Sequence, residues 1–206
     1  MSTNYFITGI STEVGKTICS AVITEALEAD YFKPVQAGDL DHGDRDKIRD
    51  LITNTKTVIH TPSYELKYPM SPHAAAARSG VEIDIEQIIR PKTANRLVIE
   101  GAGGLLVPLN QKETIADLIE ASDKVILVSR HYLGSINHSL LSIQYLNSKG
   151  IKPYILFNGD ENPETESIIL KMGDVHLLGR MPELKEIDKQ QIKRVADAFK
   201  TSLIQL

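Results

Sequence analysis

The stretch YFITGISTEVGKTICSAV, residues 5–22, decides which fold the chain is expected to adopt. A short apolar run ends at Thr8 and is followed by Gly9, a polar loop and then Gly-Lys-Thr at the start of a helical pattern. A strand, a glycine-containing loop and a helix in this order are typical of a phosphate-binding loop, because backbone N–H groups and the helix N-terminus converge on phosphate oxygens. Lys16 would neutralise β- and γ-phosphate charge and the Thr17 hydroxyl could ligate Mg²⁺. The stretch therefore predicts a nucleoside triphosphate site, although five residues rather than four separate Gly9 from Gly15.

Composition limits the possible partners. The 206 residues are 42% hydrophobic and 24% charged, which favours one compact domain over residues 1–206. A formal net charge of −4 gives no electrostatic reason to bind nucleic acid or an anionic membrane. No apolar run approaches the roughly 20 residues of a membrane-spanning helix, and no signal-peptide pattern opens the chain. We expect a soluble, cytoplasmic protein with small-molecule ligands and no nucleic-acid or membrane partner.

Periodicity along the chain predicts an α/β fold. Short apolar runs without alternation are typical of a mostly parallel, doubly wound sheet with helices on both faces, as in three-layer P-loop NTPases. The expected strands are residues 5–8, 31–36, 96–100, 124–129, 154–158 and 176–178. The expected helices are residues 16–28, 114–121, 136–149, 163–172 and 188–203. Residues 57–91, rich in proline and alanine near their centre, are interpreted as an active-site insertion.

Two further strands end in charged residues that belong with a nucleotide site. RLVIEGAGG delivers Glu100 at the carboxyl end of a buried strand, where open α/β sheets bind ligands, so Glu100 resembles a Walker B acid. Lys33 ends the apolar strand in YFKPVQAG and could stabilise charge on a transferring phosphoryl group. Asp44 and Asp46 follow at a helix start, so one of them could complete the Mg²⁺ shell. Helix capping is the alternative role, and we prefer it for Asp44.

Together these motifs resemble the dethiobiotin synthetase family. The resemblance covers nearly the whole chain through GISTEVGKT, FKPVQAG, SPHAAA, VIEGAGGLLVPL, TIADL and VILVSRHYLGSINHSLLS, and it weakens beyond Asn158. It implies a homodimer with its active site at the subunit interface. It also implies an ATP-dependent ligase in biotin synthesis, which joins CO₂ to 7,8-diaminopelargonate through a carbamate and a carbamic-phosphoric anhydride and closes the ring. A carbamate and a triphosphate are both anions, so this chemistry needs clustered cations and directed N–H groups.

The resemblance also implies roles for individual residues. Lys16, Lys33 and Thr12 would be catalytic, and Thr17, Asp46 and Glu100 would surround Mg²⁺. The residues expected at ATP are Thr12, Glu13, Val14, Gly15, Lys16, Thr17, Asp46, Glu100, Asn158, Met181, Pro182 and Glu183. The residues expected at the substrate are Thr12, Lys33, Ala37, Gly103 and, from the partner subunit, Leu133, Gly134, Ser135, Ile136 and Asn137. The last five open a helix, so their N–H groups could receive a carboxylate tail, although an ordinary loop-to-helix junction would look the same.

One departure and one alternative accompany this resemblance. The family usually has Ser or Thr in the segment after the strand lysine, where this chain has Ala37, so a hydroxyl contact to carbamate or phosphate is missing. The alternative is a nucleotide-switch ATPase of the partition or division-site type. Those proteins carry a lysine directly after the first P-loop glycine, and here that position is Ile10.

Overall fold

The computed structural model describes residues 3–206, and its centre is a six-stranded, fully parallel sheet. The sheet contains β1 (Asn4–Gly9), β2 (Asp30–Phe32), β5 (Leu97–Gly104), β6 (Lys124–Arg130), β7 (Tyr154–Asn158) and β8 (His176–Met181), in the order β2-β5-β1-β6-β7-β8. The central strands are buried on both faces, which explains their apolar runs without alternation. The expected doubly wound α/β class is confirmed.

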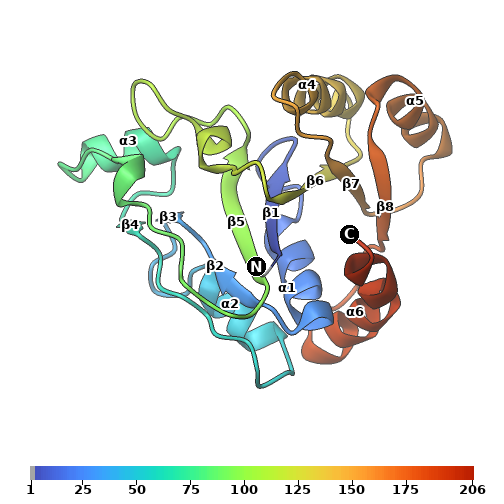
Figure 1. Cartoon of the computed structure of the whole chain (residues 1–206), viewed down its shortest axis with the longest axis horizontal. Helices are drawn as coiled ribbons and strands as arrows, with labels where there is room; N and C mark the ends of the chain where they lie inside the picture. The colour runs from blue at the N-terminus through green and yellow to red at the C-terminus, as the bar shows by residue number, and fades with distance from the viewer. Residues whose placement is uncertain (1–2) are drawn as a thin grey trace.

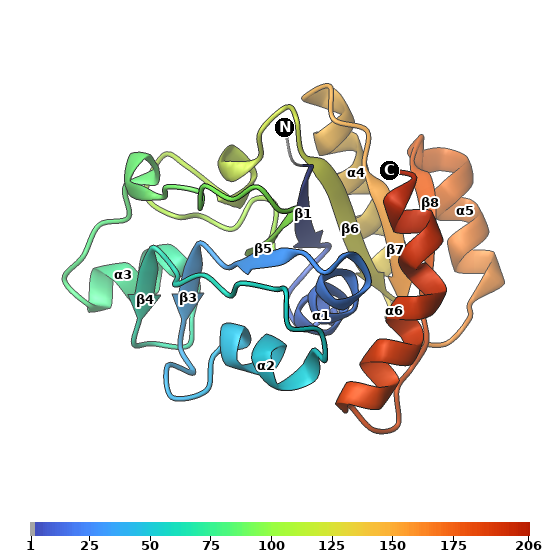
Figure 2. The same ribbon diagram turned by 60° about the horizontal axis from the view of Figure 1, so that its bottom comes forward.

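Helices cover both faces of this sheet. α1 (Lys16–Leu27), α2 (Asp44–Leu51) and α6 (Lys189–Ile204) lie on one side, and α4 (Ser135–Ser148) and α5 (Pro163–Gly173) lie on the other (Figure 1). Figure 2 shows the same layering from another direction, with α1 and α6 packed side by side. Local signals set several helix starts, since Asn162 and Asp188 accept N-cap hydrogen bonds from Thr165 and Gln191.

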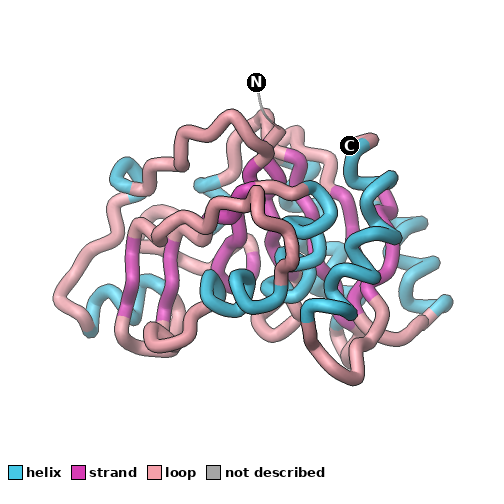
Figure 3. Tube along the Cα trace, turned by 90° about the horizontal axis from the view of Figure 1, so that it is seen from below, coloured by secondary structure: helices cyan, strands magenta, loops and turns pink. Residues whose placement is uncertain are grey.

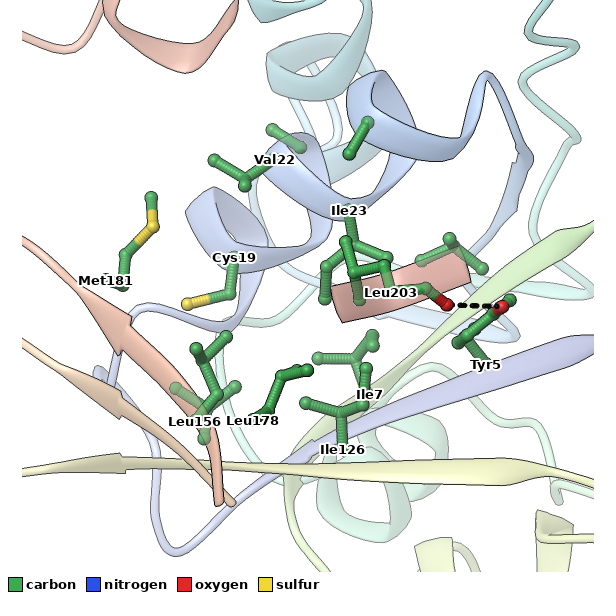
Figure 4. Packing of buried hydrophobic residues seen from close by; sticks show 14 of the residues in the cluster. Tyr5, Ile7, Cys19, Val22, Ile23, Ile126, Leu156, Leu178, Met181 and Leu203 are labelled. Carbon is green, nitrogen blue, oxygen red and sulfur yellow. Dashed lines mark hydrogen bonds between the residues drawn. The ribbon is translucent and has the colours of Figure 1, made fainter. Parts of the chain in front are cut away.

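The main core lies between the sheet and the α1 and α6 helices. Cys19 and Ile23 of α1 meet Ile7 and Ile126 of the sheet, with Leu203 of α6 beside them (Figure 4). Most of α1 is buried, so the helix that follows the phosphate-binding loop is fixed from several sides. The buried α1 helix therefore holds the phosphate-binding loop rigidly at the edge of the sheet where β1 ends.

The segment between β2 and β5 forms a satellite beside the sheet. It contains β3 (Val35–Ala37), β4 (Tyr64–Leu66), α3 (Pro72–Arg78) and the short 3₁₀ helix η1 (Ile85–Gln87); β3 and β4 form a separate two-stranded sheet. The tube in Figure 3 shows these two strands apart from the main sheet. The satellite packs through a second core that includes Phe32, Leu66 and Ile99.

Two expected elements were wrong. Residues 31–36 are not one strand, because Pro34 has no N–H to donate to a ladder and the chain leaves the main sheet there to form β3. Residues 114–121 are not an α-helix, since only the 3₁₀ helix η2 (Ile115–Leu118) forms in a compact loop. Within residues 3–206, none of the helices has the length and hydropathy needed to cross a membrane.

Candidate active site

The phosphate-binding loop links β1 to α1 in the geometry that its sequence predicts. Gly15 adopts a φ of 88° as the N-cap of α1, a left-handed conformation that glycine adopts without strain. No side chain caps this helix, so its first backbone N–H groups face the loop and are available to an anion. The Lys16 ammonium folds back and donates to the Ser11 carbonyl at 2.9 Å. The loop therefore presents N–H groups and a cation at one place.

Lys16 is unusually deeply placed for a lysine, with 8% of its surface exposed. Burial lowers the pKa of Lys16 to about 8, and the nearby Glu100 charge offsets only part of this effect. A triphosphate bound at the loop would favour the charged form of the same ammonium. Binding of a triphosphate at the loop would therefore raise the pKa of Lys16.

Glu100 lies in the middle of β5 rather than at its carboxyl end, because the strand continues to Gly104, and it is the centre of a buried polar cluster. Its Oε1 atom accepts hydrogen bonds from Thr17 Oγ1 at 2.9 Å and from Lys33 Nζ at 3.1 Å, while its Oε2 atom accepts from the Tyr31 hydroxyl at 2.9 Å. The residue is 1% exposed. The structure thus brings together three of the residues that the sequence singled out, Thr17, Lys33 and Glu100, and adds Tyr31, which sequence reasoning missed.

Lys33 lies between two carboxylates. Its ammonium pairs with Glu100 and with Asp44 of α2. Burial opposes the charge of Lys33, but Glu100 and Asp44 outweigh burial and raise the pKa of Lys33 above its ordinary value. Burial likewise opposes ionisation of Asp44, yet Lys33 and Lys47 hold the pKa of Asp44 below its ordinary value. Both shifts favour the charged forms, so Lys33 and Asp44 form an ion pair near neutral pH.

The structure brings Asp44 rather than Asp46 to the cavity. Asp44 lines the cavity beside Lys33, whereas Asp46 accepts a hydrogen bond from the Gly43 backbone N–H at 3.0 Å and one from Arg49 at 2.5 Å. Side chains two positions apart on an α-helix point roughly 200° apart around its axis, so the two carboxylates face different ways. Asp46 has the capping position that we assigned to Asp44, and Asp44 takes its place in the cluster.

These groups surround a cavity of about 550 Å³. Of the expected site residues, the structure brings to its wall Thr12, Glu13, Gly15, Lys16, Thr17, Lys33, Ala37, Glu100 and Gly103. Sequence reasoning missed other wall residues, among them Gln36, Ala102 and Val107. Residues 69–72 of the segment interpreted as an active-site insertion also line the cavity. Gly103 has a φ of 72°, and a Cβ there would lie 2.8 Å from Val107. Val107 also lines the cavity, so a side chain at position 103 would crowd the cavity wall.

The donor atoms at the edge of this cavity fit a hard divalent cation such as Mg²⁺. Thr17, Asp44 and Glu100 offer a hydroxyl and two carboxylates, and Lys33 shows that the position between the carboxylates accepts a cation. Among residues 3–206, no group of three or more His, Cys, Asp or Glu side chains is arranged to hold a metal. Mg²⁺ fits this sparse set because it keeps several waters and takes further oxygens from substrate phosphates.

The residues expected at adenine lie on the other side of the phosphate-binding loop. Asn158, at the end of β7, donates from Nδ2 to the Val14 carbonyl at 2.8 Å, so its amide touches the loop directly. The Gly159 N–H donates to the Met181 carbonyl at 2.9 Å, which holds the ends of β7 and β8 together. Pro182 and Glu183 follow Met181 and are exposed. These residues do not line the cavity that holds Lys33.

The segment expected at the substrate tail, 133–137, does not line this cavity either. Leu133 and Gly134 precede α4, and Ser135, Ile136 and Asn137 form its first turn. Gly134 is the N-cap, and no side chain caps the helix. Leu133 is fully exposed, and Leu106 and Leu141 expose 60% and 57% of their surfaces near an apolar groove of about 470 Å³. Most of the segment faces outward in a single copy of the chain, whereas Ser135 is buried.

The fold and the loop define the class of protein. A central parallel sheet with a phosphate-binding loop between its first strand and a buried helix is that of a P-loop ATPase, and the profile of the family described as AAA domain matches residues 3–191. Sequence relatives narrow this class. An ATP-dependent dethiobiotin synthetase BioD of Christiangramia forsetii is 54% identical over 100% of both chains, and one of Cytophaga hutchinsonii is 50% identical over 93% of this chain and 94% of its own. The chain therefore belongs to the ATP-dependent dethiobiotin synthetase family, which confirms the expected resemblance and the expectation of an ATP-dependent ligase.

Solved structures agree on the fold. A ParA family ATPase from Chlorobium tepidum superposes with a TM-score of 0.60 at 15% identity, covering 99% of this chain and 97% of its own. At this identity the likeness concerns the fold alone.

Proposed function

We propose that the protein catalyses the ATP- and Mg²⁺-dependent carboxylation and ring closure of 7,8-diaminopelargonate with CO₂, which gives dethiobiotin in biotin biosynthesis. The observation that carries this proposal is the shared cavity, in which two buried ammonium groups, Lys16 and Lys33, stand beside the phosphate-binding loop. Two anions must meet in this reaction, and cations held in the same cavity reduce their repulsion. The described residues would act as one ligase domain.

The reaction would run in three balanced steps. One amine of the substrate attacks CO₂ and loses a proton, which forms a carbamate. A carbamate oxygen attacks the γ-phosphorus of ATP and the bond from that phosphorus to ADP breaks, which gives a carbamic-phosphoric anhydride. The second amine attacks the carbonyl carbon and loses a proton, the carbon–oxygen bond to phosphate breaks, and phosphate leaves as the ring closes.

The chain supplies positioning and charge for these steps rather than a nucleophile. Lys16 and the loop N–H groups would hold the β- and γ-phosphates, and Lys33 would stabilise the negative charge that moves between carbamate and phosphate. Thr12, Glu13 and Gly103 would lie along the substrate and the γ-phosphate, and Ala37 offers that site no hydroxyl. Asn158 would recognise adenine, since an amide both donates and accepts hydrogen bonds.

Thr17, Glu100 and Asp44 would hold Mg²⁺, with Asp44 replacing Asp46 in the set that we expected. When bound, Mg²⁺ neutralises phosphate charge and polarises phosphoryl oxygens. Lys33 currently pairs with both carboxylates of this set. It would turn toward the substrate anions once the two carboxylates have another cation.

The protein would work as a homodimer with a site at each interface. The segment 133–137 lies away from the cavity of its own chain and starts a helix without a side-chain cap. A second copy could place these N–H groups at the substrate carboxylate, and the exposed Leu106, Leu133 and Leu141 would be covered by the contact. A two-fold axis would then make both sites equivalent.

The direct test is phosphate release by the purified protein with Mg·ATP and bicarbonate, with and without 7,8-diaminopelargonate, followed by mass analysis of the product. We expect release that depends on the diamine, a product with the mass of dethiobiotin, and no turnover in Lys16→Ala. Phosphate release at the same rate without the diamine, and no new product, would contradict the proposal.

A further inference from the structure

Tyr31 is placed by strand register next to the proposed metal site. β2 runs parallel to β5 with Tyr31 opposite Val98, so two residues further along Lys33 lies level with Glu100. Because side chains alternate along a strand, Tyr31 and Lys33 point to the same face of the sheet. The phenol therefore rises along that face toward the carboxylate that Lys33 also contacts.

The contact between the phenol and the carboxylate is specific. Tyr31 is 0% exposed, and its hydroxyl donates to Glu100 Oε2 at 2.9 Å. The two hydrogen bonds from Thr17 and Lys33 go to the other oxygen, Oε1. Among the side chains of residues 3–206, only the Tyr31 hydroxyl donates a hydrogen bond to Glu100 Oε2. This arrangement fixes the rotation of the carboxylate and makes its two oxygens inequivalent.

A second tyrosine shows what a purely structural contact looks like in the same core. Tyr5 is 2% exposed, and its hydroxyl donates to the Leu203 carbonyl of α6 at 3.2 Å (Figure 4). Both phenols are buried, and each donates a hydrogen bond. Only the phenol of Tyr31 reaches a residue of the proposed site.

We propose that Tyr31 is a positioning residue that orients the Glu100 carboxylate so that Oε1 faces the metal. This inference rests on the proposed role of Glu100 in holding Mg²⁺. Groups that hydrogen-bond to metal ligands typically change metal affinity or activity by about 10- to 100-fold when removed. Nothing in the sequence pattern marks Tyr31, since it reads as one apolar residue of a buried strand.

The test compares Tyr31→Phe with Tyr5→Phe, because each variant loses one buried hydroxyl and keeps the ring. The readouts are Mn²⁺ affinity, measured by electron paramagnetic resonance with a non-hydrolysable ATP analogue, and kcat and KM of the full protein. We expect Tyr31→Phe to bind Mn²⁺ about 10- to 100-fold more weakly and to lose kcat similarly, with KM for the diamine unchanged. Tyr5→Phe should lower Tm but leave Mn²⁺ affinity unchanged. Tyr31→Met, which also lacks the donor, provides the same test if the phenylalanine variant does not fold.

The outcomes separate this inference from the proposed function. If the unsubstituted protein binds Mn²⁺ with the analogue and Tyr31→Phe binds it equally tightly, Tyr31 is structural and the inference is overturned while the proposed function stands. If the unsubstituted protein binds no Mn²⁺ with the analogue, both the metal site and the role of Tyr31 are overturned.

Discussion

Asp44 and Asp46 provide a matched pair for testing the proposed metal site, because they lie two residues apart in the same helix and only Asp44 reaches the cavity. Replacing each by asparagine removes one negative charge and keeps the shape of the side chain. We expect Asp44→Asn to raise the Mg²⁺ concentration needed for half-maximal turnover. Asp46→Asn should leave that concentration unchanged.

The magnitude follows from the surroundings of each carboxylate. A unit charge about 4 Å from another contributes roughly 4 kcal/mol at an effective dielectric constant of about 20. Asp44 must exchange its ion pair with Lys33 for the metal, which offsets part of this gain. We therefore expect a net loss of about 2–3 kcal/mol in Asp44→Asn, or roughly a hundredfold in metal affinity. Asp46→Asn loses charge at a helix cap, which costs no more than about 1 kcal/mol of stability, or roughly 2–4 °C in Tm.

The assay is phosphate release as a function of Mg²⁺ at fixed ATP, with Tm measured by calorimetry for both variants. Asp44→Asn leaves Lys33 paired with Glu100, so the variant should fold. A larger increase in the Mg²⁺ requirement for Asp46→Asn than for Asp44→Asn would refute the assignment and return Asp46 to the metal site.

Other changes test the remaining roles. Lys33→Met should lower turnover by about 10²- to 10³-fold while nucleotide binding stays measurable, because it removes a cation from the reacting anions; near-normal turnover would show that Lys33 has no such role. Because burial lowers the pKa of Lys16 to about 8, ATP affinity should be constant below that pH and fall by up to about tenfold per pH unit above it. Calorimetry in two buffers measures the proton uptake on binding, and an ATP affinity that stays flat from pH 7 to pH 10 would contradict a charged Lys16 as the phosphate ligand. Ala37→Thr should alter the KM of the diamine more than that of ATP, and steady-state kinetics showing the reverse would move residue 37 away from the substrate. If each site combines two chains, Lys16→Ala and Asn137→Asp should each be inactive alone, and mixing equal amounts should restore about a quarter of the activity. Half of the dimers would then be mixed, and each would have one intact site; no restoration despite subunit exchange would exclude a shared site.

The sequence predicted the sheet and the phosphate-binding loop well because local signals determine both. Residues 154–158 form the expected strand, and the loop from Gly9 to Thr17 has a strand before it and a helix after it. The expected strand at residues 31–36 failed because apolar periodicity continued past Pro34, while the backbone could not continue its ladder there.

The contacts within the site could not be predicted, because they depend on how separate elements meet. The choice between Asp44 and Asp46 follows from the rotation of α2 against the sheet, which neither residue's neighbours in the sequence determine. The hydrogen bond from Tyr31 to Glu100 depends on the register between β2 and β5, across 69 residues of chain. Residues 133–137 show a third case, since their expected role requires a second copy of the chain.

The most direct test of the proposed chemistry follows oxygen from CO₂. In the proposed steps, a carbamate oxygen attacks the γ-phosphorus and leaves with phosphate. Turnover in freshly prepared ¹⁸O-bicarbonate with unlabelled water should therefore transfer one labelled oxygen into each inorganic phosphate, as measured by mass spectrometry, together with formation of dethiobiotin. Phosphate that carries no label, or that acquires label from ¹⁸O-water instead, would mean that water attacks ATP and would contradict the carbamate route.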